Sequence, residues 1–143
     1  MARYAQGIYE VKFPEKYIGK TKPRYRSGWE MMFFRFCDNN PSVLSWASES
    51  ISIPYKNPLT GKQTIYIPDV FVLYVTKNKV QVAELIEIKP SAQTNLAEAK
   101  SIRDQAAVVV NMAKWQAASA YCKRLGIKFR IITEAELFSG GKK

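Results

Sequence analysis

Asp69, Glu87 and Lys89 are the residues whose types and spacing best suit chemistry on a phosphodiester. Glu87 and Lys89 end an apolar segment at 80–89 that is typical of a buried strand, and residues two apart in a strand project from the same face. Asp69 follows Pro68 in the preceding strand segment. Such carboxylates can hold a hard cation such as Mg²⁺, which supplies a hydroxide nucleophile and neutralises charge on a phosphate. The pattern predicts metal-dependent hydrolysis of DNA.

Each of these residues also has a structural interpretation. A Pro-Asp pair is often a turn or a bulge, and Glu87 and Lys89 could pair with charges on neighbouring strands. Their joint arrangement favours the catalytic interpretation, because an Asp on one strand is followed by Glu-x-Lys at the end of the next. Lys89 could orient or activate the attacking water, or stabilise the transition state. The sequence leaves these roles open.

The absence of histidine limits the kinds of catalytic site that are possible, and the strong positive charge limits the kinds of binding partner. No histidine occurs in the 143 residues, which excludes Ser-His-Asp and Cys-His catalytic sets and histidine-ligated zinc. A net charge of +10 favours nucleic acid as the partner over an acidic membrane surface, although charge can also serve solubility alone. No apolar run is long enough for a membrane span, and no signal peptide is visible. Cys37 and Cys122 lack metal-ligand spacing and are expected to be reduced and buried.

Residues 1–26 form a basic arm with interleaved aromatic residues, in which proline and glycine argue against a continuous helix. Basic side chains can neutralise DNA phosphates, while the rings pack on the protein or stack on exposed bases. The candidate DNA-binding residues are Lys20, Lys22, Arg24 and Arg26. In the alternative interpretation, the rings pin an extended segment to the domain and the lysines are merely solvated. The two interpretations are not exclusive.

The rest of the chain alternates helical and strand patterns. We expect helices at 27–39 and 95–124, a strand or bent pair of strands at 43–55, strands at 63–75, 80–89 and 127–133, a terminal turn at 134–138 and a flexible tail at 139–143. The turns between 43 and 89 predict a three-stranded antiparallel meander. The long helical connection after it would let the last strand return parallel to the third. We therefore expect an α/β domain over 27–138.

Glu30 is a candidate with two competing roles. Ser27 is a good N-cap for the first helix, and Glu30 stands three residues later, where it could bond back to the Ser27 amide in a capping box. If the start of this helix lies near the strand ends, Glu30 could instead add a third carboxylate to the site.

Several motifs resemble known nucleases. The segments Ile67-Pro68-Asp69-Val70 and Glu87-Ile88-Lys89 resemble the PD-(D/E)xK signature. The segments Tyr17-Ile18-Gly19-Lys20, Trp46-Ala47-Ser48-Glu49, Asn57-Pro58-Leu59-Thr60-Gly61-Lys62, Tyr66-Ile67-Pro68-Asp69 and Glu84-Leu85-Ile86-Glu87-Ile88-Lys89-Pro90 resemble the head-completion nucleases of large contractile-tailed phages. That resemblance extends over residues 1–133, and the family is similar to the N-terminal nuclease domain of the transposition endonuclease TnsA.

The resemblance implies a restriction-endonuclease-like core, in which a three-stranded antiparallel meander and a returning strand are flanked by helices. It implies double-stranded DNA as the substrate and Mg²⁺ as the cofactor, with Mn²⁺ as a substitute. Carried over, it places Glu30, Asp69, Glu87 and Lys89 in the active site, with the three carboxylates as metal ligands. Superfamily members often use a Gln or Lys on the following helix. Of Lys100, Arg103, Gln105 and Lys114, we select Gln105.

The resemblance also implies a virion-assembly nuclease that acts in the host cytoplasm during head completion, after DNA packaging and before tail attachment. Phage head or neck proteins would be its partners, and retention in the virion stays open. A homodimer or two encounters would let one catalytic domain cut both strands. The alternatives are a structural head–neck or DNA-end-binding protein with weak or no catalysis, and a host-type transposition or repair nuclease.

Overall fold

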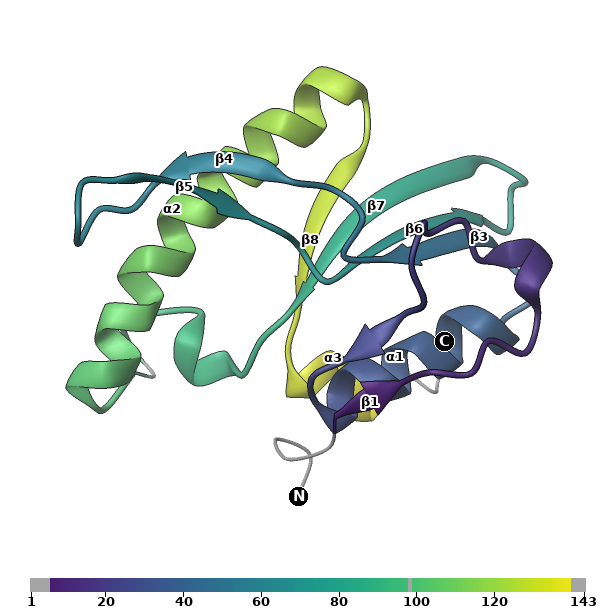
Figure 1. Cartoon of the computed structure of the whole chain (residues 1–143), viewed down its shortest axis with the longest axis horizontal. Coiled ribbons are helices and arrows are strands. Elements are labelled where there is room, and N and C mark those ends of the chain that lie inside the picture. Colours follow the sequence, from purple (N-terminus) through teal and green to yellow (C-terminus); the bar gives the residue numbers. More distant parts are fainter. Residues whose placement is uncertain (1–5, 98, 140–143) are drawn as a thin grey trace.

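The computed structural model describes residues 6–97 and 99–139 (Figure 1). The helices are α1 (Gly28–Asn39), α2 (Ile102–Leu125) and α3 (Glu134–Ser139), with single 3₁₀ turns at Pro14–Lys16 and Ser91–Gln93. The strands are β1 (Gly7–Ile8), β2 (Arg24–Tyr25), β3 (Val43–Ser48), β4 (Ile53–Lys56), β5 (Gln63–Tyr66), β6 (Val70–Val75), β7 (Gln81–Ile88) and β8 (Lys128–Ile132). Ser139 of the expected tail ends α3, and residues 140–143 lie outside the described residues.

A four-stranded sheet of order β3-β6-β7-β8 forms the centre of the molecule. β3, β6 and β7 pair antiparallel, and β8 returns parallel to β7 after the long α2 connection. The expected α/β fold, with its meander and returning strand, is therefore confirmed. The parallel pairing requires a long crossover, and the segment between β7 and β8, which contains α2, is long enough to provide it.

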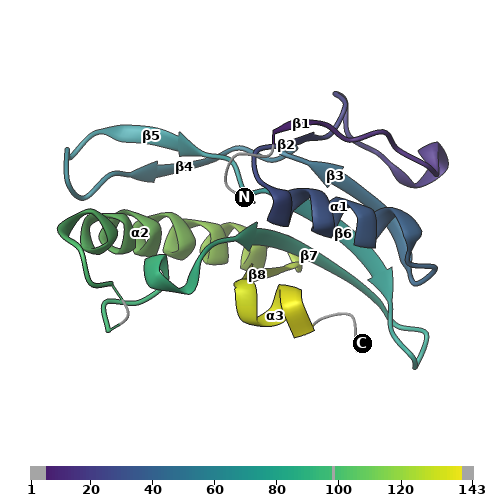
Figure 2. The same cartoon turned by 90° about the horizontal axis from the view of Figure 1, so that it is seen from below.

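The strand segments expected at 43–55 and 63–75 are each divided in two, and their adjoining parts, β4 and β5, form a separate hairpin. β4 and β5 pair with each other as a two-stranded sheet that lies beside α2 (Figure 2). The chain turns away from β3 at Glu49, whose φ of 48° is unusual for a non-glycine residue. It returns through the buried Pro68, which cannot donate a ladder hydrogen bond and so separates β5 from β6. The bend that the sequence allowed at 43–55 is thus a division into two sheets.

Apolar side chains cover both faces of the central sheet. On one face, Ile86 and Ile88 of β7 pack with Phe34 of α1. On the other face, Leu85 packs with Trp115 of α2 and with the inner side of the hairpin. This alternation gives β7 its apolar character at both parities, and it directs Glu87 and Lys89 toward the α2 side. Helical spacing from Trp29 and Phe33 predicts that Phe36 belongs to the core-facing stripe of α1, but Phe36 is 42% exposed.

α2 begins later than the sequence pattern suggested. Asn95, with Glu98 three residues later, has the spacing of a capping box, which predicts that the helix begins near residue 95. The N-cap is instead Ser101, whose hydroxyl accepts the Asp104 N–H. Glu98, the expected partner of Asn95, lies outside the described residues. Helical spacing predicts that Ile102 lies on the apolar face of this helix. Ile102 is instead 85% exposed, because this end of α2 extends past the sheet (Figure 2). Among the described residues, no helix combines the length and hydropathy needed to cross a membrane.

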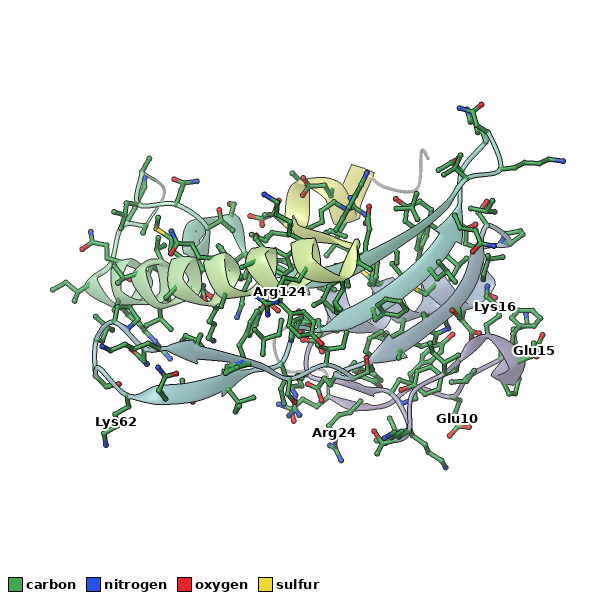
Figure 3. The ribbon with its side chains drawn as sticks, turned by 90° about the horizontal axis from the view of Figure 1, so that it is seen from above. Glu10, Glu15, Lys16, Arg24, Lys62 and Arg124 are labelled. Atoms are coloured by element: carbon green, nitrogen blue, oxygen red, sulfur yellow. The ribbon has the colours of Figure 1, made fainter. Side chains whose placement is uncertain are left out.

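The N-terminal arm packs on the domain through its aromatic residues. Tyr9 and Tyr17 contact the core cluster around Trp46. The fully buried Asp38 of α1 accepts hydrogen bonds from the Tyr9 hydroxyl and from the Lys12 and Phe13 amides. One side of the arm is therefore fixed to α1, while basic side chains such as Arg24 point away from the body (Figure 3).

We expect Asp38→Ala to lower the free energy of unfolding by about 2 kcal/mol or more, because three donors lose a buried acceptor. The control is Asn39→Ala, at the neighbouring exposed residue, which should change the free energy of unfolding by about 0.5 kcal/mol at most. Urea denaturation of both variants checks this. Equal free energies of unfolding in Asp38→Ala and Asn39→Ala would show that the Asp38 contacts do not hold the arm.

Candidate active site

Asp69 and Glu87 meet where β6 begins and β7 ends. Val70 is paired with Ile86, so one further step of the antiparallel register sets Asp69 opposite Glu87. The Ile88 N–H donates to Asp69 Oδ2 at 2.7 Å, which fixes the aspartate against the end of β7. The structure thus brings together two carboxylates that are 18 positions apart in the sequence.

Glu87 is buried, with 4% of its surface exposed. Its Oε1 accepts the Tyr66 hydroxyl at 2.8 Å, and its Oε2 lies 3.5 Å from Lys89 Nζ. Lys89 itself is partly exposed, and its amide donates to the Ile132 carbonyl of β8. The end of β7 therefore presents a buried carboxylate beside an ammonium that solvent can reach. Tyr66 was not among the residues chosen from the sequence.

The electrostatics of the pair disfavour two ionised carboxylates. Burial raises the pKa of Asp69 well above its usual value, and the charges of Glu87 and Glu30 raise it further. Burial also raises the pKa of Glu87, against the opposing effects of Lys89 and the Tyr66 hydroxyl. Negative charge is thus concentrated where water cannot fully solvate it, and a cation would relieve that cost.

Glu30 lies at the start of α1, close enough to influence this pair. Ser27 caps the helix by accepting the Glu30 N–H, as expected. The Glu30 carboxylate, however, bonds to the Arg26 amide at 3.0 Å and not to the Ser27 amide. Burial raises the pKa of Glu30, and the charges of Glu49 and Glu87 raise it further. Glu30 therefore combines a capping role with a place beside the candidate site.

Arg26 and Glu49 form a surface ion pair at the same end of the central sheet. Arg26 Nε lies 2.8 Å from Glu49 Oε2, and a second guanidinium nitrogen lies 3.2 Å from Oε1. The Glu49 amide donates to the Asp69 carbonyl, so this pair adjoins the candidate site. Arg26, which the sequence proposed as a DNA contact, is engaged with a carboxylate in this structure, and its contact with DNA stays a prediction. The role of Glu49 was not predicted, because its position depends on the left-handed turn after β3.

Lys114, and not Gln105, is the residue of α2 that faces the carboxylates. Lys114 Nζ lies 5.5 Å from the centre of the Tyr66 ring. Burial and the charge of Lys89 lower its pKa, and Glu87 opposes this. Gln105 donates to the Ala99 carbonyl and lies nine residues earlier, about 13 Å along the helix axis. The sequence could not choose between them, because both lie within the helix and only the packing of α2 decides which of its residues faces the carboxylates.

Asp69 and Glu87 provide oxygen ligands of the kind that Mg²⁺ prefers. Within the described ranges, no three histidine, cysteine, aspartate or glutamate side chains converge as a metal-binding group. Glu30 is therefore not gathered with the other two as a third ligand. Two carboxylates still fit Mg²⁺, which is commonly held by one or two carboxylates together with water and substrate phosphate.

The other three candidate DNA contacts lie on the exposed side of the arm. Lys20, Lys22 and Arg24 are all exposed. Lys20 and Lys22 line a pocket of about 320 Å³ that Tyr9 and Tyr17 also line. The Ser48 N–H donates to the Tyr17 hydroxyl, which connects this part of the arm to the end of β3. The pocket therefore lies near the end of β3 that precedes Glu49.

We expect Asp69→Asn to raise the melting temperature by a few degrees at pH 7 in a chelator, because the amide removes one of the crowded negative charges and keeps an oxygen for the Ile88 N–H. Thermal denaturation checks this. As the control, Glu84→Gln should lower the melting temperature, because Glu84 is ion-paired with Arg130 at 2.9 Å. Destabilisation by Asp69→Asn would contradict the electrostatic account.

Comparison with known proteins agrees with this geometry. The family model described as TnsA-like endonuclease N terminal matches residues 40–134, a range that includes Asp69, Glu87 and Lys89. The head completion nuclease of Enterobacteria phage T4 is 35% identical over 148 aligned positions, which cover 96% of each protein. The fold, with its meander and returning strand, fits the restriction-endonuclease-like core expected of such domains. The chain therefore belongs to the family of TnsA-like endonuclease N-terminal domains.

Proposed function

We propose that this protein is a Mg²⁺-dependent endonuclease that hydrolyses DNA phosphodiester bonds during the completion of phage heads. The observation that carries the proposal is the opposition of Asp69 and Glu87 at the end of β7, with Lys89 beside them. Membership of an endonuclease family supports the class of reaction. The name of the phage T4 relative, a head completion nuclease, supports the biological setting.

Asp69 and Glu87 would hold the cation. Burial raises the pKa of both carboxylates, and the charge of Glu87 raises the pKa of Asp69 further, so a bound divalent cation would favour their ionised forms. When bound, Mg²⁺ would lower the pKa of a water molecule and neutralise charge on the phosphate. The Ile88 amide and the Tyr66 hydroxyl each occupy one oxygen of these carboxylates, which fixes the direction of the remaining ones.

Lys89 would act on the reacting phosphate. Its ammonium lies on the same face as Glu87 and is 26% exposed, so it can reach a ligand that approaches the end of β7. From there it could orient the attacking water or stabilise the negative charge that develops in the transition state. Mn²⁺ would substitute for Mg²⁺, because it accepts the same oxygen ligands.

DNA would be held through its phosphates. Lys114 is half-buried and, within the described part of the chain, has no carboxylate within ion-pair distance, so it is available to a phosphate near the site. Lys20, Lys22 and Arg24 are exposed on the arm and would bind the backbone further away. Double-stranded DNA is the proposed substrate, and a homodimer or two encounters would serve to cut both strands.

The proposed setting is the host cytoplasm during virion assembly, after DNA packaging, with head or neck proteins as partners. A second candidate function is a structural head–neck or DNA-end-binding protein. The net charge of +10 and the exposed lysines of the arm favour it, since they would bind DNA without any metal. Metal-independent binding without cleavage of any form of DNA would support this alternative.

We expect the wild type to cleave supercoiled plasmid with Mg²⁺ and not in a chelator. Glu87→Gln should lower the cleavage rate by about 10²-fold or more, since one of the two cation ligands becomes neutral. Glu84→Gln is the matched control, because Glu84 is a buried glutamate on the opposite face of the same strand. Full activity in Glu87→Gln, or equal losses in both variants, would refute the site assignment.

We expect Lys89→Ala to lose cleavage by about 10²-fold or more while Mg²⁺ still raises its melting temperature, because the carboxylates remain. Plasmid cleavage and thermal denaturation with and without Mg²⁺ separate the two effects. Loss of the Mg²⁺-induced rise would instead indicate that Lys89 acts by organising the cation site.

A further inference from the structure

β7 carries two buried glutamates, and each accepts a hydrogen bond from a tyrosine. The Tyr74 hydroxyl donates to Glu84 Oε2 at 2.7 Å, and the Tyr66 hydroxyl donates to Glu87 Oε1 at 2.8 Å. The two glutamates are three residues apart, so they lie on opposite faces of the sheet. The same type of contact thus occurs in two different surroundings within one strand.

The pair on the α1 face has a close counter-ion. Arg130 Nε lies 2.9 Å from Glu84 Oε1, so the hydroxyl and the guanidinium together occupy both oxygens of Glu84. Charge and hydrogen bonding are both satisfied within the protein. A buried carboxylate completed in this way is a structural element.

The pair on the α2 face is incomplete by comparison. Lys89, the cation nearest to Glu87, lies 3.5 Å from Oε2, beyond normal hydrogen-bond distance. Glu87 also lies beside the negative charges of Asp69 and Glu30. Tyr66 therefore occupies only Oε1 of Glu87. The other oxygen, Oε2, faces Lys89 and the candidate cation site.

Tyr66 is itself held firmly. It is 3% exposed and packs in the cluster that contains Trp115, with the Tyr55 ring edge-on at 6.5 Å. The Lys114 ammonium lies over its ring. Tyr66 ends β5 three residues before Asp69. The same short segment therefore places Asp69, one candidate ligand, and the Tyr66 hydroxyl, which donates to Glu87, the other candidate ligand.

We infer that Tyr66 is a positioning residue for the cation site: its hydroxyl holds Glu87 Oε1, so that Oε2 is presented to the metal in one orientation. This rests on the proposed function and goes beyond it, because it assigns a role to a residue that does not touch the reacting atoms. Groups that orient metal ligands commonly contribute about 10- to 100-fold to metal affinity.

The test compares Tyr66→Phe with Tyr74→Phe, which removes the same hydroxyl–glutamate bond on the opposite face. Binding of Mn²⁺ is measured by calorimetry on the full chain, together with the Mg²⁺ concentration that gives half-maximal plasmid cleavage. Tyr66→Phe should weaken Mn²⁺ binding about 10-fold or more and raise the half-maximal Mg²⁺ concentration to match. Tyr74→Phe should change neither quantity, although both variants lose a buried hydrogen bond.

Equal Mn²⁺ affinity in Tyr66→Phe and the wild type would overturn the inference and leave the proposed function standing. If the wild type and Tyr74→Phe bind no Mn²⁺ and cleave equally in a chelator, the proposed function fails and the inference with it. Where Tyr66→Phe does not fold, Glu87→Asp serves instead, because it keeps the charge and draws the carboxylate back from the hydroxyl. Unchanged Mn²⁺ affinity in that variant would also overturn the inference.

Discussion

The repulsion between Asp69 and Glu87 is the constraint around which this structure is arranged. Two carboxylates face each other at one end of the two central strands, where burial has removed much of their solvation, and this raises the pKa of both. Such a pair is costly to folding, so the rest of the domain must hold it in place. The backbone ladder between β6 and β7 does so rigidly, since the same hydrogen bonds that define the register bring the two residues together.

Each of the elements around this pair brings one group into its neighbourhood. α1 brings Glu30, the turn after β3 brings the Glu49 amide to the Asp69 carbonyl, the hairpin brings Tyr66, and α2 brings Lys114. The arm is attached to the same framework through Asp38, so its exposed basic residues are presented by a fixed segment. The packing of the arm's rings on the domain is confirmed, whereas DNA binding by its exposed lysines, Lys20 and Lys22, stays a prediction.

Much of the architecture could be predicted because apolar periodicity and turn residues are local properties. The meander, the parallel return of β8 and the Ser27 cap of α1 follow from them. The start of α2 did not, because two residue pairs had capping-type spacing and only Ser101 serves as the cap. Ile102 was assigned to the core from helical spacing alone, but no sheet lies under that end of the helix.

For the site, the sequence by itself determined the side chains that can do chemistry: Asp69, Glu87 and Lys89 stand in a motif whose spacing places two of them on one strand face. Tertiary structure decided which further groups join them. Tyr66, Glu49 and Lys114 reach the site from a hairpin, a left-handed turn and the middle of a helix, and Gln105 does not. The physical reason is that strand register propagates from neighbouring residues, whereas contacts between separate elements depend on how their apolar faces pack.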